Sequence, residues 1–283
     1  MKLFNILTGF ILASTLTACN ISVNQVTAGS LQSYRVDVSK PVDTQRTTEM
    51  QLDVGSASTI IGVGGNGLLN GTVETNVADW KPLVVTADNR VHIRQTEFNG
   101  IPPFNSQNDW HVKIGQGIPV SLTINAGAIK GEWELGGVSL RSIDWKQGAA
   151  DTTVRFSERN PVTMAWFNVD TGASTFKLLG LANTNTDKMH ISMGAGALNL
   201  RFDGALTRNM TVTIEGGAAA VTVDSGGNQV EVLVGQSLST VNRGDWAQDA
   251  DTYQSPEWVK GPQPKITVMT KLAASSLSLV NGH

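Results

Sequence analysis

The chain has 283 residues, of which 40% are hydrophobic and 29 are glycine, so its apolar content is that of an ordinary globular protein. Charged residues make up only 16%, which argues against a disordered chain, a coiled coil or a long solvated helix bundle. The formal net charge of −3 leaves no basic excess to displace counterions from a phosphate backbone, which argues against a nucleic-acid partner. Abundant Ser, Thr, Asn and Gly suit strands joined by turns, and we expect an all-β fold.

The first residues have the pattern of a targeting segment. Met1 and Lys2 form a short basic start, residues 3–16 are mostly apolar, and Leu-Thr-Ala precedes Cys19. This arrangement resembles the bacterial lipobox, which implies cleavage before Cys19 and transfer of a diacylglycerol to its thiol. Cys19 is the only cysteine, so no disulfide can form within the chain. An ordinary signal peptide or a membrane-spanning helix is the alternative, although the apolar run is short for a span.

The composition after the cysteine changes along the chain and suggests four segments. We divide the chain into a lipoprotein signal peptide at 1–18, a lipidated cysteine and polar tether at 19–48, an N-terminal β region at 49–121, and a repetitive β-solenoid with a C-terminal strand at 122–283. Turn residues bound short strands in the third segment and at the end of the fourth. The expected strands are Val73 to Val77, Leu83 to Val85, Val91 to Ile93 and Ile266 to Leu272, with a loop at 99–103 before Trp110 starts the main array.

Seven glycines recur through the chain: Gly55, Gly127, Gly148, Gly172, Gly194, Gly217 and Gly235. From Gly127 to Gly217 the spacings are 21, 24, 22 and 23 residues, too regular for unrelated hairpins and too short for helical crossovers. The positions five before, three before and six after each glycine are apolar without exception, and the interleaved positions are mostly polar. Each unit is therefore predicted as strand, glycine turn, strand, with glycine accepting a positive φ and letting successive backbones approach closely.

Stacking of these units predicts a single-domain β-solenoid of stacked coils, with a small β region inserted near its N-terminus. The three apolar positions then form ladders inside the stack, and an antiparallel sandwich is the alternative. The predicted ladders are Met50, Leu122, Ile143, Phe167, Met189, Val212 and Val230; Leu52, Ile124, Trp145, Val169, Ile191, Ile214 and Val232; and Ile61, Trp133, Val154, Leu178, Leu200, Val223 and Val241.

Polar positions after the glycines predict one outer face. Glu134 is expected beside Arg155 on the next coil, and Arg201 beside Asp224, where opposite charges would help the register. This face is our candidate surface for binding. Its residues are Glu132, Glu134, Thr153, Arg155, Lys177, Asn199 and Arg201.

Several of these segments resemble the bacterial toast-rack domain family, a group of envelope proteins related to the cell-wall-stress regulator LiaF. The resemblance is carried by residues 121–128, 132–140 and 193–200, by Gly148-Ala149, and by Asn76 to Pro82. It implies stacked β-coils and no particular chemistry. LiaF carries several membrane helices, whereas a lipobox takes their place here, so the resemblance leaves a regulatory role open.

Motifs for catalysis or cofactor binding are weak. Residues 62–67 match GxGxxG, but no helix is expected after them, and we interpret them as a glycine turn. His92, His111 and His190 lack metal-ligand spacing, and no catalytic residue, metal ligand or cofactor is predicted. Two interpretations remain open: acids could meet across coils, as in glycan-cleaving β-helices, and an outward indole could stack on a sugar. The residues concerned are Glu132, Glu134, Asp144 and Asp170 for the acids, and Trp166 for the indole, with Trp133 and Trp145 expected in the core.

The sequence therefore predicts a lipid-anchored protein of the bacterial cell envelope, facing the periplasm or the exterior. Its expected role is that of a non-enzymatic binding, adhesin-like or structural module, with a cell-envelope glycan or a protein as the partner. An envelope-stress sensor related to LiaF is the alternative function, and a glycan-active β-helix enzyme is a third.

Overall fold

The computed structural model describes residues 27–41, 43–95, 104–235 and 240–282. The predicted signal peptide, Cys19 and the loop expected at 99–103 lie outside the described residues. Within the described chain the fold is all-β, as predicted, with two short 3-10 helices, η1 (Ala78–Trp80) and η2 (Leu181–Thr184). No helix in these ranges is both long and apolar enough to cross a lipid bilayer.

Strands of two lengths build the fold. Six are long: β2 (Thr48–Val63), β7 (Val120–Glu134), β8 (Leu140–Arg155), β9 (Trp166–Leu179), β10 (Lys188–Arg201) and β11 (Met210–Asp224). The others are short: β1 (Gln32–Val38), β3 (Leu69–Thr75), β4 (Leu83–Ala87), β5 (Arg90–Arg94), β6 (Asn108–Ile114), β12 (Val230–Val234), β13 (Thr240–Asn242), β14 (Ala247–Asp249), β15 (Thr252–Gln254), β16 (Ile266–Leu272) and β17 (Ser276–Val280).

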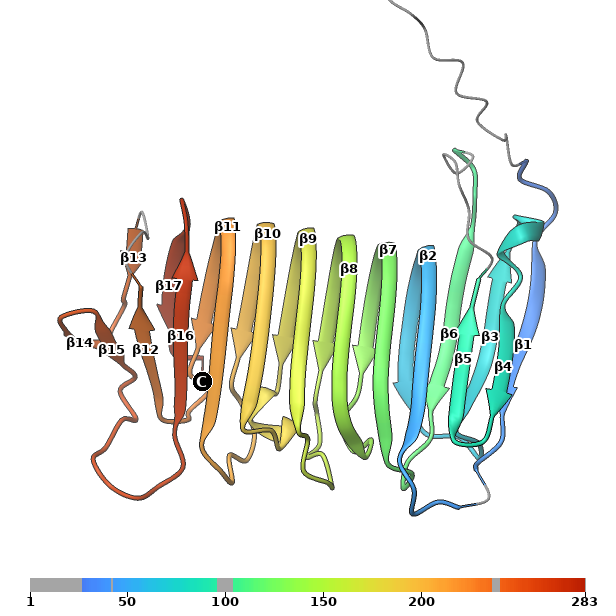
Figure 1. The fold of residues 1–283 in the computed structure, drawn as a ribbon. Coiled ribbons are helices and arrows are strands. Elements are labelled where there is room, and N and C mark those ends of the chain that lie inside the picture. Colours follow the sequence, from blue (N-terminus) through green and yellow to red (C-terminus); the bar gives the residue numbers. More distant parts are fainter. Residues whose placement is uncertain (1–26, 42, 96–103, 236–239, 283) are drawn as a thin grey trace, which may run out of the picture.

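The six long strands form the central stack, and each bends over at the same edge of the stack (Figure 1). Each strand therefore has a first limb before its glycine and a second limb after it. Both limbs pair in parallel with the same limbs of the neighbouring long strands, which confirms a solenoid of stacked coils. One pairing series shows the predicted register: Leu52, Ile124, Trp145, Val169, Ile191 and Ile214 follow one another across the six strands.

The predicted ladders lie between the two limbs and form the core. All of their residues are buried except Val241, which is partly exposed. Trp133 and Trp145 are 2% and 1% exposed, and their ring centroids lie 4.6 Å apart. Phe176 continues the aromatic contacts, with its ring centroid 5.5 Å from that of Trp145. Since each limb also contributes alternating polar residues to the outside, the stack has two solvent-facing sheet surfaces.

The glycines at the bend form a ladder along one edge. Of the two reasons predicted for glycine there, a positive φ and the close approach of backbones, only the second applies. None of the repeated glycines has a positive φ. The requirement is close approach: a Cβ on Gly127 would lie 2.6 Å from the carbonyl oxygen of Gly55, and one on Gly172 would lie 2.7 Å from that of Gly148. Gly55, the first of the ladder, has nothing within 4 Å of its Cβ position. Glycine is therefore needed at the bend of each coil that packs against the bend of a preceding coil.

Short strands complete the N-terminal end of the stack. The second limb of β2 is followed outward by β6, β3 and β1, and the first limb by β5 and β4. The prediction that Trp110 starts the main array is wrong, because β2 already pairs with β7 along both limbs while β6 lies on the other side of β2. Residues 32–38 were expected in a polar tether but form β1, in which Val36 and Val38 are buried. Residues 62–67 lead into strand β3, in agreement with the glycine turn predicted there.

The C-terminal end departs from the predicted register. Strand β16 lies between the first limb of β11 and β12, and β17 lies between the second limb of β11 and β13. Ile266 pairs with both Met210 and Val230, so Val230 aligns with Met210 and not with Val212 as predicted. Gly235 accordingly lies near Thr270 and does not continue the glycine ladder. The C-terminal strands thus replace a seventh coil.

Candidate binding surfaces

The candidate residues after the glycines lie on one outer surface, which we call the second-limb face. In the pairing register Glu132 lies beside Thr153, Thr153 beside Lys177, and Lys177 beside Asn199. A second row begins with Glu134 beside Arg155 and includes Arg201 beside Asp224. The alternation of the strands points these side chains outward, because their neighbours in sequence fill the core.

One of the two predicted charge pairs is present. The Nε atom of Arg201 lies 3.6 Å from Oδ2 of Asp224 and 3.7 Å from Oδ1 of Asp203. Glu134 instead accepts hydrogen bonds from the backbone N–H groups of Gly136 and Ser157, at 2.7 and 3.1 Å. Arg155 makes no ion pair among the described residues, so it is available to a partner.

The acids considered for catalysis do not converge. Asp144 and Asp170 lie on the first limbs, whereas Glu132 and Glu134 lie on the second limbs, so the sheet and the core separate the two pairs. In the part of the chain that the structure describes, no group of three or more His, Cys, Asp and Glu side chains could hold a metal ion. The arrangement of these four acids therefore does not favour the glycan-cleaving chemistry considered above.

A polar network crosses three strands on the first-limb face. Asp53 lies 2.5 Å from Nε2 of His92 and accepts hydrogen bonds from the side-chain amides of Gln51 and Asn125. Partial burial raises the pKa of Asp53, but the hydrogen bonds from Gln51, Asn125 and His92 together outweigh it, so the pKa lies below its ordinary value. Because β5, β2 and β7 each contribute a residue, the network fixes their register.

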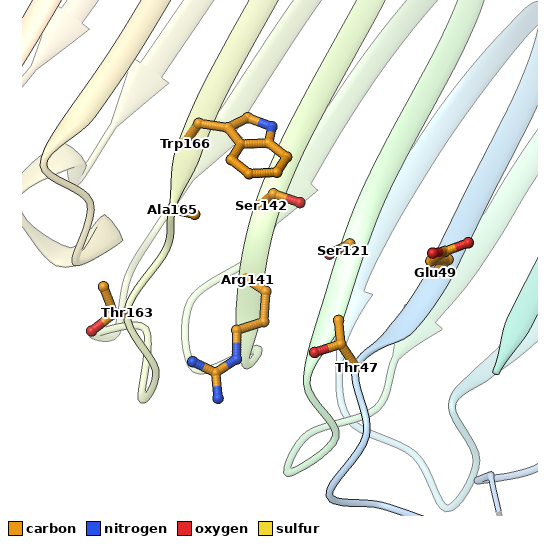
Figure 2. A pocket seen from close by; sticks show the side chains of 8 residues that line it. All are labelled: Thr47, Glu49, Ser121, Arg141, Ser142, Thr163, Ala165 and Trp166. Atoms are coloured by element: carbon orange, nitrogen blue, oxygen red, sulfur yellow. The ribbon is translucent and has the colours of Figure 1, made fainter.

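A groove lies on the first-limb face near the ends of the strands, opposite the glycine edge (Figure 2). Its volume is about 520 Å³, within the range of small-ligand sites. Ser121 and Ser142 lie along its floor, between Trp166 on one side and Glu49 on the other. We call it the Trp166 groove, and its lining residues are Thr47, Glu49, Ser121, Arg141, Ser142, Thr163, Ala165 and Trp166.

Two features of the strands shape this groove. Val120 pairs with Leu140 and Ser121 pairs with Ser142, so Arg141 is the extra residue of a β-bulge. A bulge turns a side chain away from the regular alternation, and Arg141 is exposed at the groove. Trp166, which was predicted to face outward, is 44% exposed, and its Nε1–H donates a hydrogen bond of 2.9 Å to Oδ2 of Asp144.

Trp166 was predicted from the sequence to face outward, whereas the other residues of the groove were not predicted as a site. A signal was present: Glu49, Ser121, Ser142 and Trp166 are each six residues before a repeated glycine, so they form one row across four coils. The row combines two small residues with a large aromatic one, which leaves a depression beside the indole. The bulge at Arg141 has no counterpart in the repeat pattern.

Residues 27–165 match the family described as the N-terminal domain of toast_rack. The match includes the N-terminal strands and the coils built on β2, β7 and β8. It ends before residues 193–200, on which the expected resemblance also depended. No curated protein matches the chain.

Solved structures with a similar course of the chain include proteins from the following three bacteria. A candidate cell adhesion protein from Clostridium sporogenes is 15% identical, with a TM-score of 0.49, over 89% of this chain and 100% of that chain. A candidate adhesin from Bacteroides fragilis is 9% identical, with a TM-score of 0.42, over 89% of this chain and 97% of the other. A candidate adhesin from Parabacteroides distasonis is 12% identical, with a TM-score of 0.38, over 89% of this chain and 98% of the other.

Proposed function

Residues 27–165 belong to the toast_rack N-terminal domain family, and on this scaffold we propose that the chain acts as a non-enzymatic binding module of the cell envelope. The proposal depends above all on one observation: the stack brings Glu132, Arg155, Lys177 and Arg201 onto one continuous outer face although they come from four different coils. Such a face supports association by many polar contacts of modest individual strength. Affinity then comes from their number and from the number of copies presented.

The charges on the second-limb face favour a polar partner. Lys177 and Arg155 are exposed, and neither forms an ion pair within the described part of the chain. Glu132, also exposed, adds an acceptor in the same row as Lys177. Mixed donors and acceptors at strand spacing are complementary to a glycan or to a polar protein surface of the envelope.

Anchoring through the acylated Cys19 completes the proposal. Twelve residues lie between Cys19 and the first residue of β1, Gln32, so the connection, thirteen Cα-to-Cα steps, can reach at most about 45 Å from the anchor. Because β1 lies at one end of the stack, a lipid on Cys19 would hold that end nearest the membrane. The coils of the binding face would follow with increasing distance from the bilayer.

A quadruple variant with Glu132, Glu134, Arg155 and Arg201 changed to Ser tests the function. We expect its retention on isolated cell envelope, measured by co-sedimentation, to fall at least about tenfold if each lost contact contributes a few tenths of a kcal/mol or more. A matched variant on the opposite face changes Lys146, Asp170, Glu215 and Lys271 to Ser and also removes two acids and two bases. This control should retain wild-type binding.

Circular dichroism spectra and melting curves would verify that both quadruple variants keep the fold. Equal retention of the two variants would refute the assignment of the binding face. Hydrolysis of an envelope glycan by the wild-type protein would refute the non-enzymatic role.

A further inference from the structure

The Trp166 groove contains polar groups that the protein itself does not use. The hydroxyl groups of Ser121 and Ser142 and the guanidinium group of Arg141 have no hydrogen-bond or ion-pair partner among the described residues. Glu49, the acid of the groove, is already paired with Arg90, at 2.7 Å between Nε and Oε2. The free groups of the groove are therefore one cation and two hydroxyls, that of the partly exposed Ser121 and that of Ser142, which is 3% exposed.

The indole of Trp166 is held in place although it is largely exposed. Its N–H group is bound by Asp144, whose other carboxylate oxygen accepts a hydrogen bond of 2.9 Å from Asn168. Aromatic faces are electron-rich, and a carboxylate that accepts the indole N–H increases this character. A fixed, electron-rich and exposed face attracts the weakly positive C–H groups that line one side of a pyranose ring.

The charged groups beside the indole are two cations and the carboxylate of Asp144, which binds the indole N–H and Asn168. Met189 pairs with Phe167, which places Lys188 beside Trp166 on the next strand, and Lys188 makes no ion pair within the described ranges. Arg141 lies on the other side of the indole, on strand β8. A ligand that contacts Trp166 thus meets the two cations and the carboxylate of Asp144, a net positive charge that favours an anionic ligand.

We propose that the Trp166 groove binds a saccharide that carries a carboxylate group. The pyranose ring stacks on Trp166, the carboxylate pairs with Arg141, and the ring hydroxyls bind the side chains of Ser121 and Ser142. From Glu49 to Trp166 the groove crosses three strand spacings, about 14 Å, which leaves room for the sugar between its walls. This site lies on the face opposite to the proposed envelope-binding face and does not depend on it.

An acidic peptide would complement the cations, but the groove does not lie at a free strand edge to which a peptide backbone could bind. Extended peptides gain affinity from backbone hydrogen bonds to an exposed strand edge. The strands under the groove, β2, β7, β8 and β9, are each paired on both sides within the stack. The floor consequently offers side-chain hydroxyls and an aromatic face, which suit a sugar.

Titration calorimetry with tetragalacturonate tests the proposal on the mature chain. The fully methyl-esterified tetrasaccharide serves as the uncharged probe, and tetraglutamate serves as the acidic peptide probe. We expect tetragalacturonate to bind more tightly than either. Trp166→Ala should weaken its binding about tenfold or more, and Trp166→Phe should weaken it less. Arg141→Gln should reduce the affinity for tetragalacturonate to that for the ester and leave ester binding unchanged.

Two further variants separate the groove from general surface effects. Ser121→Phe fills the floor while retaining Trp166 and Arg141, and it should abolish binding of the tetrasaccharide. Glu132→Ser, on the second-limb face, should leave the binding unchanged. Undetectable tetragalacturonate binding, equal binding by wild type and Trp166→Ala, equal affinity for the ester, or tighter binding of tetraglutamate would overturn the proposal.

Discussion

The glycine ladder allows a comparison between two chemically identical substitutions. Gly127→Ala places a Cβ atom 2.6 Å from the carbonyl oxygen of Gly55, whereas Gly55→Ala places one in open space. Neither glycine has a positive φ, so both positions accept alanine as far as the backbone angles are concerned. Both substitutions reduce the conformational freedom of the unfolded chain by the same amount, a stabilisation of about 0.4–1 kcal/mol. The difference between the variants therefore isolates the contact between neighbouring coils.

The magnitude of that difference follows from the shift that the clash requires. Carbon and oxygen must move apart by several tenths of an ångström, and overpacking of this kind costs about 1–3 kcal/mol. We expect Gly55→Ala to be neutral or slightly stabilising and Gly127→Ala to have a free energy of unfolding lower than that of Gly55→Ala by about 1–3 kcal/mol. At about 2–4 °C per kcal/mol for a protein of this size class, the melting temperatures should differ by about 2–12 °C.

Urea unfolding followed by circular dichroism would measure both free energies. Equal stabilities of the two alanine variants would refute the argument that close approach of neighbouring coils is what demands glycine. The same conclusion would follow if Gly55→Ala were the more destabilised variant.

Three other predictions concern the core, the polar network and the anchor. Val154→Asp buries an unpaired charge and should lower the free energy of unfolding by several kcal/mol, whereas Thr153→Asp on the outer surface should be nearly neutral; urea unfolding that shows equal losses would mean that the register is wrong. Because the folded pKa of Asp53 is lowered, the stability that its charged form contributes is complete above the unfolded pKa of about 4 and is lost as the pH falls through the folded pKa. Melting curves from pH 6 to pH 3 should therefore show a smaller acid-induced drop in melting temperature for Asp53→Asn than for the wild type. An equal drop in the two proteins would contradict this. Cys19→Ser should prevent lipidation and leave unprocessed or soluble protein, which fractionation and mass spectrometry would detect; a mature variant still wholly in the membrane fraction would contradict the lipobox assignment.

The apolar period was sufficient to predict the coils because each inward position repeats in every unit. A core residue such as Val154 must contact equivalents in both neighbouring coils, so its chemistry repeats and the alignment is visible in one sequence. The same argument explains why Trp133 and Trp145 were placed correctly. Nothing comparable constrains the outer surface, where Glu134 was expected to pair with Arg155 and instead binds two backbone amides.

The features that were missed depend on single events in the chain. The bulge at Arg141 shifts the register of one strand pair at one position, and no repeat reveals it. Strand β1 was missed because its polar residues dominate the composition, although Val36 and Val38 alternate with them and are buried. The register at Val230 was wrong because a later segment, β16, inserts between two strands that are neighbours in sequence. A long-range insertion of this kind leaves no signal in the local pattern.

The parallel register of the long strands fixes the length of the limbs but allows the connections between them to vary in length. Both limbs of a coil are tied to their neighbours residue by residue, so insertions between glycines are accommodated in the connections opposite the glycine edge, where the spacings of 21 to 24 residues differ. A whole coil, by contrast, can be duplicated or lost without disturbing the ends of the stack. Each added coil would lengthen the molecule by about 4.8 Å. The length of the molecule therefore changes in steps set by the distance between hydrogen-bonded strands.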